Sequence, residues 1–93
     1  MSMTIWKYPF EITGPFELML PTEARVLSVG VQDERPCMWV LVEAENLLEE
    51  RRFVIVGTGH PAPKPTTSEH IGTFQQSPFV WHLFEFRPPI ERE

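Results

Sequence analysis

The sequence predicts an all-β fold: a small antiparallel sheet, sandwich or barrel of about six to seven short strands with at most one short helix. Three observations favour this class. Ten prolines are spread between the apolar runs of the 93-residue chain, about twice the usual share of ~5%. Each proline removes a backbone donor and disfavours a helix that would pass through it. The apolar runs themselves are short, and most alternate with the period of two that is typical of strands.

The expected strands are bounded by prolines or by turn residues. In the third of them Leu27, Val29 and Val31 alternate with polar residues and should share one face. The fourth is a continuous apolar run rich in β-branched residues, as expected of a strand that is covered on both faces. The seven expected strands are residues 4–8, 16–20, 26–32, 37–42, 52–58, 71–75 and 79–86.

Polar segments between these strands predict the connections. Residues 33–36 and 76–78 have turn composition and should close two hairpins. The acidic segment 43–50 is either a turn of helix or a long polar hairpin loop. Residues 57–70 combine glycine and proline and predict the most mobile loop. We expect a single small β-rich domain over residues 1–93, with residues 87–93 extended or frayed.

Length and charge exclude several classes of function. Eight Lys+Arg against 13 Asp+Glu give a net charge of −5, which argues against a partner that is a long nucleic acid or an anionic membrane. A chain this short buries only about 60–65% of its unfolded surface, so oligomerisation is a natural way to add buried area. Cys37 is the only cysteine, and no apolar run has the length of a signal peptide or a membrane helix. We therefore expect a soluble, cytoplasmic protein.

No sequence motif predicts catalysis or metal binding. The candidate groups His60, His70, His82 and Cys37 lie at none of the spacings typical of zinc sites, and no serine lies in a nucleophile elbow. In the strand pattern His82 shares a face with apolar neighbours, which predicts a partly buried, hydrogen-bonded histidine. We therefore expect no catalytic residue, no metal and no cofactor, and we expect the protein not to be an enzyme.

The sequence Gly-Thr-Gly-His-Pro at 57–61 is the strongest candidate for a ligand site. Glycine lets the backbone approach a ligand closely, and successive free N–H groups can form an anion-binding nest. Thr58 adds a hydroxyl and His60 adds a ring donor, so a phosphate is a plausible ligand. The structural alternative is a glycine-rich strand end that turns into a proline-rich loop.

Other polar and aromatic residues could complete such a site. Thr73 and Gln75 should project from one face together with Ile71, either to hydrogen-bond a base or ribose or to face water. Trp6 and Tyr8 could stack on a base or pack in a core or an interface. Arg51 and Arg52 border the strand that leads to residue 57 and could pair with phosphate. The expected ligand-binding residues are Trp6, Tyr8, Arg52, Gly57, Thr58, Gly59, His60, Thr73 and Gln75.

Six strings of the sequence resemble a family of small proteins. They are IWKY at 5–8, LSVGVQ at 27–32, PCMWVLV at 36–42, GTGHP at 57–61, IGTFQ at 71–75 and VWHLFE at 80–85. Together they resemble a domain-of-unknown-function family of phages, prophages and bacteria, over nearly the whole chain. GTGHP and IGTFQ are the most specific strings. In size the chain is also similar to phage anti-CBASS sponge proteins, which oligomerise and sequester cyclic nucleotides.

These resemblances imply two classes of function. The first is a phage-encoded, non-enzymatic, homo-oligomeric sponge that sequesters a small nucleotide signal such as a cyclic dinucleotide. The residues at 57–60 and Thr73 would then contact phosphate or base, and Trp6 or Tyr8 would stack. The alternative is a structural or protein-interaction module, either a virion accessory component or an inhibitor that docks on a host protein. A binder predicts a pocket lined by residues 57–60, Thr73 and an arginine. An interaction module predicts a flat apolar patch with an exposed tryptophan.

Overall fold

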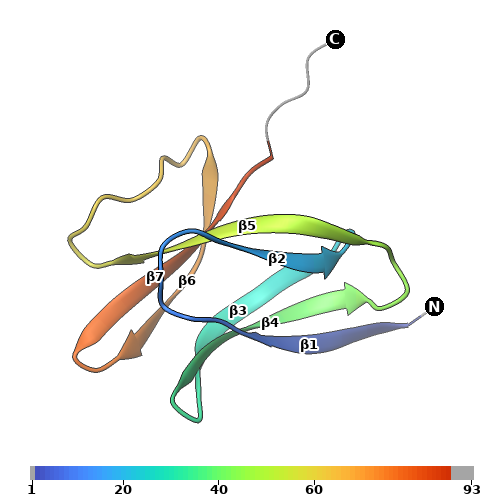
Figure 1. Cartoon of the computed structure of the whole chain (residues 1–93), viewed down its shortest axis with the longest axis horizontal. Helices are drawn as coiled ribbons and strands as arrows, with labels where there is room; N and C mark the ends of the chain where they lie inside the picture. Colours follow the sequence, from blue (N-terminus) through green and yellow to red (C-terminus); the bar gives the residue numbers. More distant parts are fainter. Residues whose placement is uncertain (1, 89–93) are drawn as a thin grey trace.

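The computed structural model describes residues 2–88, and these form seven antiparallel strands in two sheets with no helix (Figure 1). The predicted all-β class is therefore confirmed, and the architecture is a sandwich. The strands are β1 Met3–Pro9, β2 Phe16–Pro21, β3 Arg25–Gln32, β4 Arg35–Glu43, β5 Leu48–Gly57, β6 Ser68–Gln76 and β7 Phe79–Phe86.

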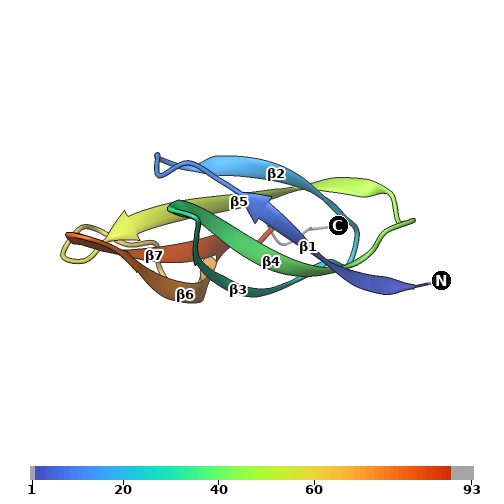
Figure 2. The ribbon, with the colours of Figure 1, turned by 90° about the horizontal axis from the view of Figure 1, so that it is seen from below.

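Three strands form sheet A in the order β1-β4-β3, and four form sheet B in the order β2-β5-β7-β6. Figure 2 shows the two layers from the side, with β2 in the upper layer and β3 in the lower one. The β3–β4 hairpin turns at Asp33 and Glu34, both with positive φ, which is typical of tight hairpin turns. The β6–β7 hairpin turns at Ser77 and Pro78, joined by a cis peptide bond.

The acidic segment 43–50 contains no helix. Four residues, 44–47, form the connection, and the rest belong to the flanking strands. The connection is not a hairpin, because β4 lies in sheet A and β5 lies in sheet B. The helix interpretation is therefore wrong, and the hairpin-loop interpretation is wrong in part: the segment is a loop, but it links the two layers.

Side chains from both sheets form one core. Its fully buried members include Met38, Val40 and Val42 of β4, together with Phe53 of β5 and Leu83 of β7. Each large apolar side chain buried in this way contributes about 1.5–3 kcal/mol. The contacts join both sheets into one cluster, so the two layers are stabilised together.

Aromatic rings fill the end of the sandwich where β1 leads into β2. Phe10 stacks on Phe16 with ring centroids 5.3 Å apart, and Phe16 stacks on Phe53 at 5.5 Å. Phe74 of β6 meets Phe10 edge-on at 6.1 Å. These rings connect the 10–15 segment to three strands of sheet B and hold the chain where it crosses between sheets.

A β-bulge in β3 overturns the predicted alternation of that strand. The pairing with β4 shifts between Val26 and Ser28, so Leu27 is an extra residue. Val26 and Val29 therefore pack on the core, whereas Leu27 is 43% exposed and Val31 is 37% exposed. The expectation of one shared face is therefore wrong for Leu27, whereas Val29 and Val31 follow the bulge and share a face, with Val31 near the end of the strand.

A second bulge, in β6, corrects the predicted position of Ile71. The pairing with β7 shifts between His70 and Gly72, and Ile71 packs on the core instead of sharing a face with Thr73. A Cβ atom on Gly72 would lie 2.9 Å from Cγ1 of Val29, so β6 and β3 approach closely at one side of the sandwich. The two sheets therefore meet along this edge.

The predicted extended tail falls largely outside the described residues. Arg87 and Pro88 follow β7 and belong to no strand, and residues 89–93 lie beyond the part that the structure describes. The backbone N–H of Arg87 donates to the carbonyl of Thr67, which ties the end of β7 to the start of β6. Residues 2–88 include no helix long and apolar enough to span a membrane.

Candidate functional site

The Gly57–His60 segment is a tight turn at the end of β5. The N–H of His60 donates to the carbonyl of Gly57 at 3.1 Å, and Gly59 has a φ of 92°. A turn of this kind requires a positive φ at its third residue, which glycine adopts without strain. A Cβ atom on Gly57 would lie 3.2 Å from the ring of Trp81, so this glycine makes room for the indole. Both glycines thus have structural roles in the turn.

Two of the predicted ligand residues, Thr58 and Thr73, meet on the outer face of sheet B. His82 of β7 lies between them: its Nε2 is 2.8 Å from Thr58 Oγ1 and its Nδ1 is 2.9 Å from Thr73 Oγ1. Nε2 of His70 is 3.2 Å from the same Thr73 hydroxyl. Strands β5, β7 and β6 are neighbours in the sheet, which brings these four residues into one line. We call them the His–Thr cluster.

The hydroxyl of Thr58 also lies 3.4 Å from the carbonyl of Val80 and can donate its single hydrogen there. With that hydrogen so placed, the distances allow His82 Nε2–H to donate to Thr58, the Thr73 hydroxyl to donate to His82 Nδ1, and His70 Nε2–H to donate to Thr73. The tautomers of the two histidines set this direction. The cluster lies on an open face, where it presents hydroxyls and imidazole edges to solvent.

Sequence reasoning did not assign His70 or His82 to the ligand site. For His82 the strand pattern predicts partial burial and a hydrogen bond, and both are confirmed. Its place between Thr58 and Thr73 depends on the order of the strands, which no local pattern reveals. No sequence pattern indicated that His70 lies beside Thr73, because the bulge between His70 and Gly72 sets their relative position.

The remaining predicted residues do not join this cluster. Nδ1 of His60 lies 3.5 Å from the position that a Cβ atom on Gly57 would occupy. Successive side chains in a strand alternate, so this position is on the side opposite Thr58. Gln75 lies on the same face as Thr73, two residues further along β6. Arg52 lies six residues before Thr58, on the order of 20 Å along β5 at ~3.3 Å per residue. These positions do not form the pocket expected of a nucleotide binder.

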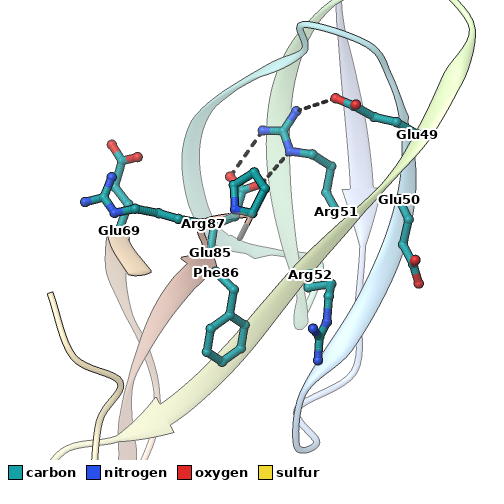
Figure 3. A pocket seen from close by; sticks show the side chains of 9 residues that line it. Glu49, Glu50, Arg51, Arg52, Glu69, Glu85, Phe86 and Arg87 are labelled. Carbon is teal, nitrogen blue, oxygen red and sulfur yellow. Dashed lines mark hydrogen bonds and ion pairs between the residues drawn. The ribbon is translucent and has the colours of Figure 1, made fainter. Parts of the chain in front are cut away.

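A pocket of about 580 Å³ lies at the other end of sheet B (Figure 3). It is lined by Glu49, Glu50, Arg51, Arg52, Glu69, Glu85, Phe86, Arg87 and Pro88. Three arginines face four glutamates, so the charge sum of the lining is 3 − 4 = −1. This balance does not favour a phosphate ligand.

Arg51 is held in this pocket by several partners at once. Its guanidinium forms a two-pronged ion pair with Glu85 and also donates to the carbonyl of Ala24 at 2.9 Å. The hydrogen bond to Glu85 raises the pKa of Arg51 above its ordinary value, and burial opposes it. Figure 3 shows the two dashed contacts to Glu85 and a further one to Glu49. Arg51 is therefore a structural group rather than a free cation for a ligand.

Arg52 is also engaged, though at the surface. It pairs with Glu17 at 3.8 Å and lies 5.8 Å from the centre of the Phe86 ring. On the same side, a hydrogen bond with Glu17 raises the pKa of the Glu50 carboxyl. The side chains around Arg52 thus compensate its charge.

Trp6 and Tyr8 lie on sheet A, away from all of these residues. They share the face of β1 that points toward sheet B, since they pair with Val40 and Met38 of β4, and their rings are 6.4 Å apart. Tyr8 packs against the core, and burial raises the pKa of its phenol. Trp6 is 39% exposed. An exposed tryptophan on an apolar strand is the feature expected of an interaction module.

Potential metal ligands do not gather within residues 2–88: no group of three or more His, Cys, Asp or Glu side chains could hold an ion there. Cys37 is free and 2% exposed, in the middle of sheet A. A buried thiol of this kind behaves as a small apolar side chain.

The fold and these surfaces define a small β-sandwich with an open polar face on one sheet and an exposed apolar strand on the other. Over residues 1–93 the chain matches the family described as a domain of unknown function, DUF7352, and it belongs to that family. No curated protein and no solved structure matches it. The predicted membership of a domain-of-unknown-function family is therefore confirmed.

Proposed function

We propose that this protein is a non-catalytic protein-binding module, and that β1 is the strand through which it binds. The observation that carries the proposal is the exposure of β1. Every residue from Met3 to Lys7 is exposed, with Met3 and Ile5 at 55% and Trp6 at 39%. Large apolar side chains on both faces of one strand favour burial by a partner.

The backbone of β1 supports the same proposal. It pairs with β4 on one side, in unbroken register from Met3 to Pro9, and no strand within residues 2–88 pairs with the N–H and C=O groups of its other edge. Edge strands are usually protected by bulges or charges, and β1 has no bulge. Its one charged side chain, Lys7, hydrogen-bonds Gln32 of β3 at 2.6 Å. An extended apolar segment could add to this edge as a further antiparallel strand.

The polar chemistry of the described residues is consistent with binding rather than catalysis. His70 and His82 direct their side-chain hydrogen bonds to threonine hydroxyls, and Cys37 is buried in sheet A. A general base is usually oriented by a carboxylate or placed in a cleft, and the His–Thr cluster lies on an open face.

Site-specific photo-crosslinking tests the proposed binding strand. A photo-crosslinking residue replaces Ile5 in the full chain, and in a matched variant it replaces Phe79, which is 57% exposed on the β6–β7 hairpin. In cells that express the protein we expect a discrete protein adduct from position 5 and none from position 79. No adduct at position 5, or the same adducts at both positions, would show that β1 is not a binding strand.

A second candidate function is the sequestration of a cyclic dinucleotide at the His–Thr cluster. Its support is the convergence of Thr58 and Thr73 on His82, with Gln75 on the same face. Hydroxyls and imidazole edges in a line suit the phosphates and base edges of such a ligand. A homo-oligomer would be needed to enclose it, because the face is open.

Thermal shift with a panel of cyclic di- and trinucleotides tests this candidate. A ligand at 100 times its dissociation constant adds about 2.7 kcal/mol, or a shift of several degrees for a domain of this size. The shift should be reduced in Thr73→Val and retained in Thr66→Val, a matched change in the β5–β6 loop. No shift with any nucleotide would remove this candidate.

A further inference from the structure

We propose that the partner of β1 is a second copy of this chain, with the two β1 strands paired antiparallel about a two-fold axis at Trp6. This inference rests on the proposed function, because it names the partner of the same strand. The result would be one continuous sheet with the strand order β3-β4-β1 in one copy followed by β1-β4-β3 in the other. An isologous contact of this kind is the commonest route to a closed dimer.

One register of antiparallel pairing between two β1 strands uses the whole strand and opposes no like charges. The strand has seven residues, Met3 to Pro9, and Trp6 is the central one. Pairing about Trp6 uses the whole strand and places Ile5 opposite Lys7 and Thr4 opposite Tyr8 of the other copy. Pairing about Lys7 would set two lysines opposite each other, and pairing about Ile5 would leave the end of the strand unpaired. Opposed like charges are unfavourable, so the register centred on Trp6 is preferred.

Trp6 would be covered in such a dimer. Its ring lies on the face of sheet A that carries Val40, yet it remains 39% exposed. Figure 1 shows the reason: β1 lies at the margin of the molecule, on the side away from β5. Two tryptophans opposite each other on neighbouring strands form a favourable cross-strand pair, and aromatic pairs contribute beyond the area that they bury.

The other sheet edges are less suited to a partner. β2 follows Pro15 and ends at Pro21, which limits strand addition at both of its ends, whereas β1 has a proline, Pro9, at one end. The edges of β3 and β6 approach each other at Val29 and Gly72. The acidic excess of the chain is also absent from β1, since residues 3–9 contain no carboxylate. Repulsion between two copies of net charge −5 would therefore not be concentrated at this contact.

The mass of the purified full chain in solution is the first test. One chain weighs 10.8 kDa, and we expect a species of twice that mass that dissociates on dilution. In the proposed register Ile5→Lys sets each new lysine opposite Lys7 of the other copy, and it should weaken the dimer by about tenfold or more. Met19→Lys, a matched change at a 53% exposed apolar residue of the other free edge, should leave the dimer intact.

A charge-swap variant checks which residues face each other. In the double variant Ile5→Lys with Lys7→Glu, each new lysine faces a new glutamate of the other copy, and the dimer should regain most of its affinity. A monomer at every concentration would overturn the proposal. So would equal losses in Ile5→Lys and Met19→Lys, or a double variant no tighter than Ile5→Lys.

Engineered cysteines test the centre of the register. Residues directly opposite on antiparallel strands have Cα atoms about 4.5–5.5 Å apart, within disulfide range. Trp6→Cys should therefore form a disulfide-linked dimer on oxidation. Thr4→Cys should not, because its counterpart would lie on the order of 13 Å away along the strand. Linkage through position 4 and not position 6 would overturn the register.

The crosslinking experiment separates this inference from the proposed function. An adduct from position 5 with twice the mass of the chain supports both. An adduct of any other mass leaves β1 as a binding strand and overturns the second copy as its partner. The absence of any adduct overturns both.

Discussion

At the scale of single residues, burial decides which charged side chains stabilise the fold. Arg51 and Arg52 are neighbours in β5, yet the side chain of Arg51 is 18% exposed and that of Arg52 is 63% exposed. Arg51 has two carboxylate partners and a backbone carbonyl, and its loss would leave Glu85 partly buried without its main cation. The two arginines should therefore differ in their effect on stability.

We expect Arg51→Met to lower the free energy of unfolding by about 2–4 kcal/mol. The same substitution at the next residue, Arg52→Met, should cost less than about 1 kcal/mol, because an exposed ion pair is weak. Urea denaturation of both variants measures the difference. Equal losses would mean that the pair with Glu85 contributes no more than a surface contact.

The glycines of the 57–60 turn illustrate what residue types alone can predict. Glycine predicts a turn or a close approach, and both are present: a positive φ at Gly59 and the indole of Trp81 against Gly57. Whether the group packed against Gly57 belongs to a ligand or to the protein itself depends on the neighbouring strand of the sheet. Trp81 is on β7, more than twenty residues away in sequence, so residue types near the glycines could not decide it.

At the scale of elements, local patterns predicted all seven strands and failed at the bulges. Prolines and alternation depend on the local chain, and they located each strand within a few residues. The bulges at Leu27 and Ile71 depend on how β3 and β6 pair with β4 and β7. An extra residue changes the faces of its neighbours relative to simple alternation, so the predicted faces of Leu27 and Ile71 were wrong, whereas Val29 and Val31 both follow the bulge and keep a common face.

The contact between β3 and β6 gives a test of how the two sheets close. Gly72→Ala would bring a Cβ atom to 2.9 Å from Val29 Cγ1, and we expect it to cost about 1–3 kcal/mol. Val29→Ala removes the opposing methyl group. The loss in free energy of unfolding of the double variant should therefore be smaller than the sum of the two single losses, by at least ~0.5 kcal/mol. Gly14→Ala, with nothing within 4 Å, should change stability by less than ~0.5 kcal/mol.

Additive losses in the Gly72→Ala and Val29→Ala double variant would contradict this closure. They would mean that the cost of Gly72→Ala does not arise from its contact with Val29. The measurement is the free energy of unfolding of the four chains under one set of conditions, with Gly14→Ala as the control for the general effect of a new methyl group.

At the scale of the whole molecule, topology separates the residues that the sequence grouped as one ligand site. Trp6 and Tyr8 lie in sheet A, whereas Thr73 and Arg52 lie in sheet B and Thr58 directly follows β5 of that sheet. Arg52 lies in the middle of β5, six residues before Thr58. The charge and aromatic content of the chain predicted which residue types a binding site would use. Where these residues lie in the folded protein depends on the β2-β5-β7-β6 strand order, and only long-range strand pairing sets that order.

The exposed β1 strand leads to a prediction for the stability of the whole protein. If two chains unfold together, a tenfold rise in concentration adds about 1.4 kcal/mol per dimer, or roughly 0.7 kcal/mol per chain. For a domain of this size the Tm should then rise by roughly 3–6 °C, provided that the protein is mostly dimeric at both concentrations. At a given concentration Ile5→Lys should lower the Tm and reduce its dependence on concentration, and Met19→Lys should keep that dependence. A wild-type Tm that does not change with concentration would mean that the chain is stable without a second copy, and the apolar exposure of β1 would then need a different partner.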